Sequence, residues 1–457
     1  MRIAYNSTSN EQRVTSNEQP ATMLAGFGKS VITPRVGVRL VGYFNRQAAS
    51  TGVHDDLHAR ALVLEANGVC WALCAVELCY VREPLVAQVR ALVDQETDIP
   101  GENVFIAAIH THSGPDDQDT TAWDRPLAEL IAAAIIQAGE HRQPARIGGG
   151  FGVLYGHNIN RRWLERPVDP AVGVIRVDGA QGRPLGMVTN FGCHAVVLGY
   201  DNLLISADWP GYACRQLEAM LGEDAVCLFV QGGSGDANPL TQGVRARLTS
   251  GHAVSTFTDH FYYGLPDDAE VWNIGDRGGG TFEEAAVLGQ AMAEETLRVA
   301  HGIQTTGDVE RLWARRAIVN GARPANAPST VTAEEPSLIV ERPVPPPVPG
   351  QIPLEIMGLG VDGPGIVLVG QPGEIFSETA VHLRRRLQTA GVRLPLIVGY
   401  ANGWQVYLPP PEGFVEGGYE VRWAEALGLS SQLQTRIEEA VMSEIVEHPR
   451  ANHTSNE

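Results

Sequence analysis

The sequence has few basic residues and no long apolar run, and each absence excludes a class of function. Its 457 residues include 34 Lys and Arg against 53 Asp and Glu, which leaves a formal net charge of −19 at pH 7. This balance argues against nucleic acid or an anionic membrane surface as the main partner. No stretch approaches the roughly 20 apolar residues that a membrane-spanning helix needs, so we expect no stable insertion into a membrane.

Features of secreted proteins are also missing. The first 23 residues contain no apolar core of the kind that a signal peptide requires. The six cysteines form no CxxC pair, and several lie in stretches of mostly apolar residues such as "VCWALCAVELCY" (69–80). Such surroundings are typical of buried thiols rather than of a disulfide framework. We therefore predict a reduced protein with a cytoplasmic location.

Several compact catalytic motifs are absent. No HExxH metal motif occurs. "GGSGD" around Ser234 lacks the last glycine of a Gly-x-Ser-x-Gly nucleophile elbow, because Asp236 stands there. "GGG" at 278–280 is not followed by the Lys-Ser/Thr of a P-loop. A serine hydrolase and a nucleotide-binding enzyme are therefore poorly supported.

Strand-like runs alternate with helical patterns along most of the chain. Examples are the apolar runs 103–110, 186–194 and 394–402 and the amphipathic pattern 281–302. This alternation predicts an α/β fold with layered mixed β-sheets flanked by helices.

One domain is expected between two polar ends. We predict a disordered tail over 1–22, a single domain over 23–448 and a second disordered tail over 449–457, because both ends are poor in apolar residues. A proline-rich stretch at 341–353 is interpreted as a surface crossing. The irregular segment 241–280 is either a lid or substrate wall, or an ordinary insertion.

The stretch "IAAIHTHSGP" (106–115) places two histidines at the end of an apolar run. In a strand, alternate side chains share a face, so His110 and His112 are expected to point the same way. This pattern fits a metal or catalytic site, and it fits a pair of structural histidines equally well.

Other polar residues follow further predicted strands, where open α/β sheets place their sites. His194 ends "NFGCH", Glu374 closes "VLVGQPGE", and Tyr407 follows "GYANGWQV". Histidines together with a carboxylate suit zinc, which keeps an open position for water when it is catalytic. The candidate ligands are dispersed along the chain, so their spacing alone does not define the site.

Several of these motifs together resemble one family. "GFGKSVITPRVGVRLVGYFNR", "GVHDDLHARALVLE", "IHTHSGP", "NFGCHAVVLGYDNLLISADWPG", "QGGSGDANP", "GQPGEIF" and "YANGWQVYLPPPEGFVEGGYE" resemble, in this order, the neutral/alkaline ceramidase catalytic domain, and the likeness covers roughly residues 26–420. It implies the fold of the neutral ceramidase N-terminal domain and the activity of a zinc amidohydrolase.

The resemblance also implies roles for individual residues. The zinc ligands would be His110, His194, Glu374 and Tyr407. His112 would stand beside the attacking water or the substrate carbonyl, and Arg161 and Tyr419 would stabilise the oxyanion.

The sequence departs from the family pattern at Asn238, which stands where ceramidases carry a serine. An amide cannot form an acyl intermediate, so we predict direct attack by metal-bound water, with Asn238 binding the substrate or orienting its loop. The expected substrate is a small, soluble amide, and an esterase or lactonase using the same site is the alternative. A catalytically silent metal- or ligand-binding relative is a third reading. The oligomeric state is left open, a homo-oligomer included.

Overall fold

The computed structural model describes residues 23–43, 46–163, 165–222, 224–242, 244–245, 280–324 and 351–446. Both predicted tails and most of the segments 241–280 and 341–353 lie outside the described residues, so the expectations for them stay predictions. None of the helices among the described residues combines the length and apolarity needed to cross a membrane.

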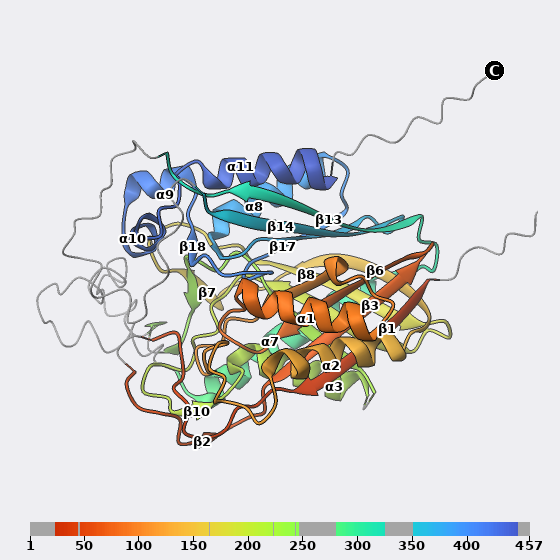
Figure 1. The fold of residues 1–457 in the computed structure, drawn as a ribbon, viewed down its shortest axis with the longest axis horizontal. Helices are drawn as coiled ribbons and strands as arrows, with labels where there is room; N and C mark the ends of the chain where they lie inside the picture. The colour runs from red at the N-terminus through yellow and green to blue at the C-terminus, as the bar shows by residue number, and fades with distance from the viewer. Residues whose placement is uncertain are drawn as a thin grey trace, which may run out of the picture.

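A mixed eight-stranded sheet forms one half of the molecule (Figure 1). Its inner pairs are antiparallel, and the outermost pairs β4–β5 and β9–β11 are parallel because a helix connects the two strands of each. In sheet order the strands are β11 (Val226–Gln231), β9 (Pro184–Phe191), β8 (Ala171–Gly179), β6 (Gln143–Val153), β1 (Leu24–Val31), β3 (His58–Ala66), β4 (Val69–Val76) and β5 (Val104–Ala108).

Four helices of the described part of the chain cover one face of this sheet. Their apolar stripes meet one set of alternate strand residues, such as Ala61 and Val63 of β3, in a continuous core. Helix α7 begins with a capping box, because the Thr281 side chain and the Glu284 carboxylate bond each other's backbone N–H groups. The helices are α1 (Glu83–Glu96), α2 (Leu127–Glu140), α3 (Asp208–Leu221) and α7 (Phe282–Gly302).

The opposite face of the large sheet packs on a second, four-stranded sheet. Leu62 and Leu64 of β3 point to this side and share a core with Leu359 and Leu368. Each buried leucine contributes about 1.5–3 kcal/mol relative to an exposed one. The second sheet has the order β13 (Arg311–Asn320), β14 (Pro353–Asp362), β15 (Ile366–Gly370) and β17 (Leu394–Val398).

A further helical layer closes the outer face of the second sheet, and Figure 1 shows the resulting order helix–sheet–sheet–helix. The layered α/β fold with mixed sheets predicted from the sequence is therefore confirmed. The layer consists of α8 (Ser377–Thr389), α11 (Leu433–Ala440) and the π-helical turn η3 (Val441–Val446).

Short elements carry four of the eight residues singled out above, namely Asn238, Glu374, Tyr407 and Tyr419. β7 pairs antiparallel with β12, and β16 pairs parallel with β18. These elements and the remaining short ones are β2 (Gly52–Val53), η1 (Gly101–Asn103), β7 (Asn158–Asn160), β10 (Leu204–Ile205), β12 (Ala237–Pro239), β16 (Glu374–Ile375), β18 (Tyr407–Leu408), α9 (Pro411–Glu416) and α10 (Tyr419–Ala426).

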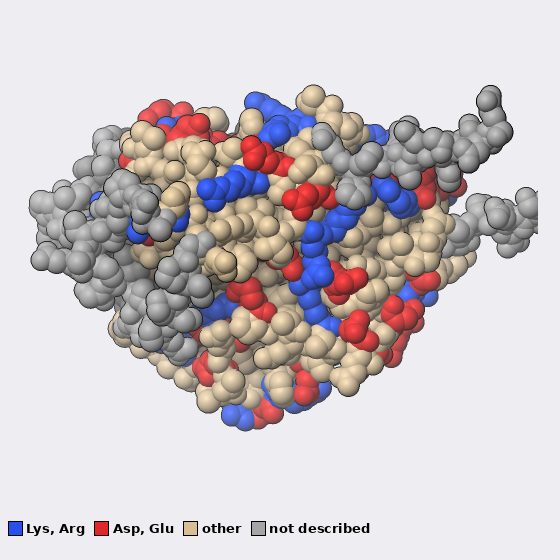
Figure 2. Space-filling model, turned by 45° about the horizontal axis from the view of Figure 1, so that its top comes forward, with Lys and Arg blue, Asp and Glu red and all other residues tan. Residues whose placement is uncertain are grey.

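The described surface mixes charges of both signs. On the face shown in Figure 2, basic side chains lie among acidic ones.

Candidate metal centre

Three residues far apart in the sequence converge in the interior. His110 follows β5, His194 follows β9, and Glu374 begins β16. His194 Nε2 lies 3.0 Å from Glu374 Oε2, and His110 Nε2 lies 3.6 Å from the same oxygen. All three side chains are buried, and their candidate ligand atoms lie within 4.8 Å of one another.

The second ring nitrogen of each histidine fixes its orientation. His110 Nδ1 donates to the Cys79 carbonyl at 2.7 Å, and His194 Nδ1 donates to the Ser234 carbonyl at 2.6 Å. Because a carbonyl can only accept, Nδ1 carries the proton in each ring, and Nε2 carries the lone pair on the side of Glu374, where His194 Nε2 also accepts from Arg161 Nη1. Hydrogen bonds of this kind orient metal-ligating histidines in proteins.

The two histidines and Glu374 present acceptor atoms that a cation can use. Burial lowers the pKa of His110 to about 3 and holds the pKa of His194 well below its ordinary value, so both rings are neutral. A neutral Nε2 and a carboxylate oxygen at 3.0 Å are both acceptors, so a proton or a cation between them removes their repulsion, and burial raises the pKa of Glu374 and so favours the proton while no cation is bound. Two imidazole nitrogens and a carboxylate oxygen form a donor set that fits zinc.

The His112 ring lies beside His110, but the backbone that places it there is not the predicted strand. Strand β5 ends at Ala108, and His110 has a left-handed backbone with φ 68°, so the two histidines do not share a strand face. Their rings still meet, with the two Nε2 atoms 3.0 Å apart. Arg46, buried beside them, donates to the His112 carbonyl.

Tyr407 and Arg161 lie next to the three converging residues. Tyr407 pairs with Glu374 across β16 and β18, and its hydroxyl accepts from Arg161 Nη2 at 3.0 Å. Arg161 Nη1 lies 3.2 Å from His194 Nε2. The predicted fourth ligand is therefore held beside the cluster, with a guanidinium between its hydroxyl and His194.

Asn238 and Tyr419 complete the set of predicted residues. Asn238 lies on β12, next to the β7 strand that leads into Arg161, and its Oδ1 accepts from Arg161 Nη1 at 3.3 Å. Tyr419 begins α10, and its ring packs edge-on against Tyr407 with the centroids 5.6 Å apart. The structure thus brings all eight predicted residues into one neighbourhood. Tyr419 contacts the Tyr407 ring rather than the three converging residues.

The sequence matches a known protein family. The family model described as "Neutral/alkaline non-lysosomal ceramidase, N-terminal" matches residues 23–314. The chain belongs to this ceramidase family. It is 25% identical to the Neutral ceramidase of Pseudomonas aeruginosa over 473 residues, covering 86% of this chain and 68% of that protein. It is also 25% identical to Neutral ceramidase B of Dictyostelium discoideum over 363 residues, covering 70% and 49%. The chain therefore spans about half to two thirds of the length of these ceramidases.

Solved ceramidase structures share the fold. The crystal structure of neutral ceramidase from Pseudomonas aeruginosa matches with a TM-score of 0.72 at 22% identity, covering 93% of this chain and 74% of that one. A structure titled "Ceramidase complexed with C2" matches with a TM-score of 0.70 at 19% identity, covering 93% and 75%. The neutral-ceramidase-like fold predicted from the sequence is confirmed.

Two further buried residues, Tyr400 and Glu420, contact the residues predicted from the sequence. The buried Glu420 carboxylate accepts from Arg161 Nε at 2.9 Å and from Arg162 Nη1 at 2.7 Å. The Tyr400 hydroxyl donates to Glu374 Oε2 at 3.2 Å. Both stand inside quoted motifs, Tyr400 in "YANGWQVY" and Glu420 in "EGGYE", but nothing in the pattern distinguishes them from packing residues.

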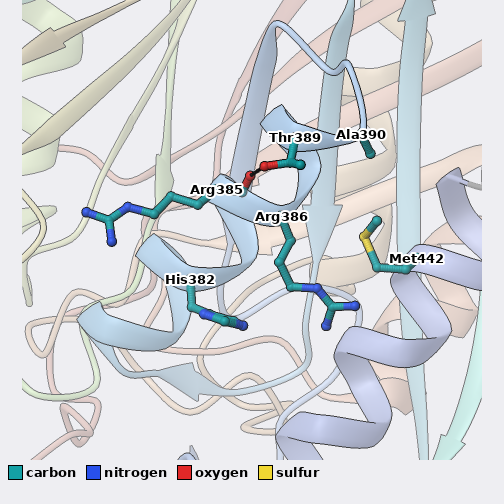
Figure 3. A pocket seen from close by; sticks show the side chains of 6 residues that line it. All are labelled: His382, Arg385, Arg386, Thr389, Ala390 and Met442. Atoms are coloured by element: carbon teal, nitrogen blue, oxygen red, sulfur yellow. Dashed lines mark hydrogen bonds between the residues drawn. The ribbon is translucent and has the colours of Figure 1, made fainter.

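A separate pocket lies on the outer helical layer. It has a volume of about 460 Å³, and its lining contains neither His110, His194 nor Glu374. Figure 3 shows Arg386 and Met442 facing each other across it. Glu438 Oε2 lies 3.3 Å from His382 Nε2 and 2.9 Å from Arg386 Nη1. The lining residues are His382, Arg385, Arg386, Thr389, Ala390 and Met442.

Proposed function

We propose that this ceramidase family member is a metal-dependent hydrolase of an amide bond. The observation that carries the proposal is the convergence of two oriented, neutral histidines and a buried carboxylate on one point, with a third imidazole beside it. Membership of a family named for ceramidases supports amide hydrolysis over other uses of such a centre.

Zinc is the proposed metal, held by His110, His194, Glu374 and Tyr407. When bound, zinc would polarise the substrate carbonyl and lower the pKa of the attacking water. The Nδ1 atoms of His110 and His194 donate to backbone carbonyls, which orients the Nε2 atoms of both rings toward the proposed metal. Tyr407 lies across a strand pair from Glu374, which places its phenol at the same end of that pair.

The other residues are assigned by their position. His112 is the proposed general base, which takes the proton of the attacking water and delivers it to the leaving amine. Burial and the neighbouring His110 hold the pKa of His112 well below its ordinary value, so its imidazole enters the reaction neutral. Arg161 and Tyr419 are proposed to stabilise the negative charge that develops on the carbonyl oxygen.

The amide side chain of Asn238 cannot act as a nucleophile, so no acyl-enzyme intermediate can form at that residue. Its Oδ1 accepts from Arg161, which leaves the two N–H donors of its amide for a substrate oxygen. We infer that water attacks the carbonyl directly and that Asn238 orients the substrate.

The relatives modify the expected substrate. They are named neutral ceramidases, which favours a ceramide, a lipid amide, over the small, soluble amide expected from the sequence alone. Ceramide is therefore the first substrate to test, followed by short polar N-acyl amides. Esters and lactones form the second candidate class, because water can attack either carbonyl with the same groups. The cytoplasmic location stays a prediction.

The deciding experiment combines metal content with turnover. Mass spectrometry of the purified protein is expected to find about one zinc per chain, and H194A and E374A are expected to lose most of it. Wild type is then assayed with ceramide, a short N-acyl amide and a matched ester. Well-folded wild type that takes up no metal even from added zinc would overturn the proposal, and one that binds zinc without turnover on all three substrates would favour a silent relative.

A further inference from the structure

The proposed ligands are linked by two hydroxyl groups that have no assigned role. Tyr400 is fully buried, with 0% of its surface exposed. Its ring stacks on the His110 ring at a centroid distance of 4.2 Å, and its hydroxyl lies 3.2 Å from Glu374 Oε2. One side chain therefore contacts two of the three converging residues.

Ser234 extends this contact to the third. Ser234 Oγ lies 2.9 Å from the Tyr400 hydroxyl, and the Ser234 carbonyl accepts from His194 Nδ1. Tyrosine has a single O–H, so when Tyr400 donates to Glu374, Ser234 must donate to Tyr400. The bonds then run in one direction, from Ser234 through Tyr400 to the carboxylate.

The backbone around Tyr400 is strained in a way that supports a functional role. Tyr400, Asn402 and Val406 have φ values of 55°, 58° and 53°, which non-glycine residues rarely adopt. Such residues persist where surrounding contacts fix them, and they cluster at functional sites. Here Asn402 Oδ1 accepts from the Ile106 N–H at 2.8 Å, and the Val406 carbonyl accepts from the Glu374 N–H at 2.6 Å.

We propose that Ser234 and Tyr400 form a positioning pair that holds His110, His194 and Glu374 in the geometry required for metal binding, an inference that rests on the proposed metal-dependent function. Tyr400 limits the rotation of the Glu374 carboxylate and of the His110 ring, and Ser234 connects that restraint to His194. Loss of partners of this kind weakens metal binding by about 10- to 100-fold in other metal sites.

The test is the metal affinity of Y400F, which keeps the ring and removes only the hydroxyl. We expect its zinc dissociation constant, measured by competition with a chromophoric chelator, to rise about 10- to 100-fold. The visible absorption spectrum of the cobalt-substituted protein is expected to change, because it reports coordination geometry. Y212F is the matched control, since the Tyr212 hydroxyl bonds His54 at 2.7 Å and neither residue belongs to the cluster.

S234A supplies a second, independent variant. It removes Oγ and keeps the carbonyl that bonds His194, so we expect a smaller loss of affinity than in Y400F. The double variant is expected to lose less than the product of the single effects, because both changes interrupt the same chain of bonds. If Y400F does not fold, S234A alone decides the question.

The outcomes separate this inference from the proposed function. Zinc affinity and cobalt spectra unchanged from wild type in the folded variants would overturn the positioning pair and leave the proposed function intact. Wild type that binds neither metal would overturn both. A weaker affinity in Y212F of the same size would also overturn the inference, because the effect would then not depend on contact with the ligands.

Discussion

The Glu420 carboxylate offers a perturbation whose size follows from its surroundings. It is 1% exposed and lies between Arg161 and Arg162, with oxygen–nitrogen distances of 2.9 and 2.7 Å. In E420Q the two buried guanidinium groups lose their shared counter-charge and keep one neutral acceptor. Removing one partner of a buried ion pair costs about 3–5 kcal/mol of stability, and we expect the lower end because the amide oxygen still accepts a hydrogen bond.

The effect has a defined dependence on pH. Burial by itself would raise the pKa of Glu420, but Arg161 and Arg162 outweigh it and hold that pKa below its ordinary value. A carboxylate with a lowered pKa stabilises the folded state above the unfolded pKa of about 4.3, and this contribution is lost as the pH falls through the folded pKa. The difference in the free energy of unfolding between wild type and E420Q should therefore have its full size at pH 7.5 and shrink below about pH 4.3.

Urea unfolding followed by tryptophan fluorescence measures both quantities. The control is E129Q, since Glu129 pairs with Arg125 at side-chain exposures of 42% and 62%, and such a pair contributes only about 0–1 kcal/mol. A loss in E420Q no larger than that in E129Q at pH 7.5 would refute the reasoning. A difference that stays constant through acid pH would show that charge is not its cause.

Two further predictions concern His112. H112A is expected to lower kcat by about 10²- to 10⁴-fold with zinc content unchanged, and loss of zinc in this variant would instead make His112 a ligand. G42A is expected to lower kcat while keeping zinc, because a Cβ at residue 42 would lie 2.3 Å from His112 Cγ. Its control is G37A, since Gly37 has a similar positive φ of 97° and nothing within 4 Å of the added atom, so equal kcat losses in the two variants would refute the role of that clash.

The layered fold was predictable because apolar alternation reports burial directly. The strand expected over 394–402 ends earlier, at Val398, since Gly399 is followed by the left-handed Tyr400. Apolar content continues through this turn, so hydrophobicity alone cannot mark its end. The eight site residues came from a resemblance covering most of the chain rather than from spacing.

The supporting contacts could not be predicted. Ser234 and Tyr400 are 166 residues apart, and Arg161 and Glu420 are 259 residues apart. A hydroxyl or a carboxylate in a motif looks the same whether it touches a ligand, a neighbour or water. Only the packing of the two sheets brings these groups to one edge, and packing of that kind leaves no local pattern in the sequence.

The order in which the converging residues occur along the chain has a consequence for biosynthesis. His110 and His194 belong to the first half of the chain and follow strands of the large sheet, whereas Glu374 follows a strand of the second sheet and lies beyond the segment 23–314 that the family model matches. During translation from the N-terminus, both histidines and all strands of the large sheet are synthesised before the carboxylate. The complete donor set therefore requires the second sheet to be packed against the first, so the candidate metal centre depends on the contact between the two sheets.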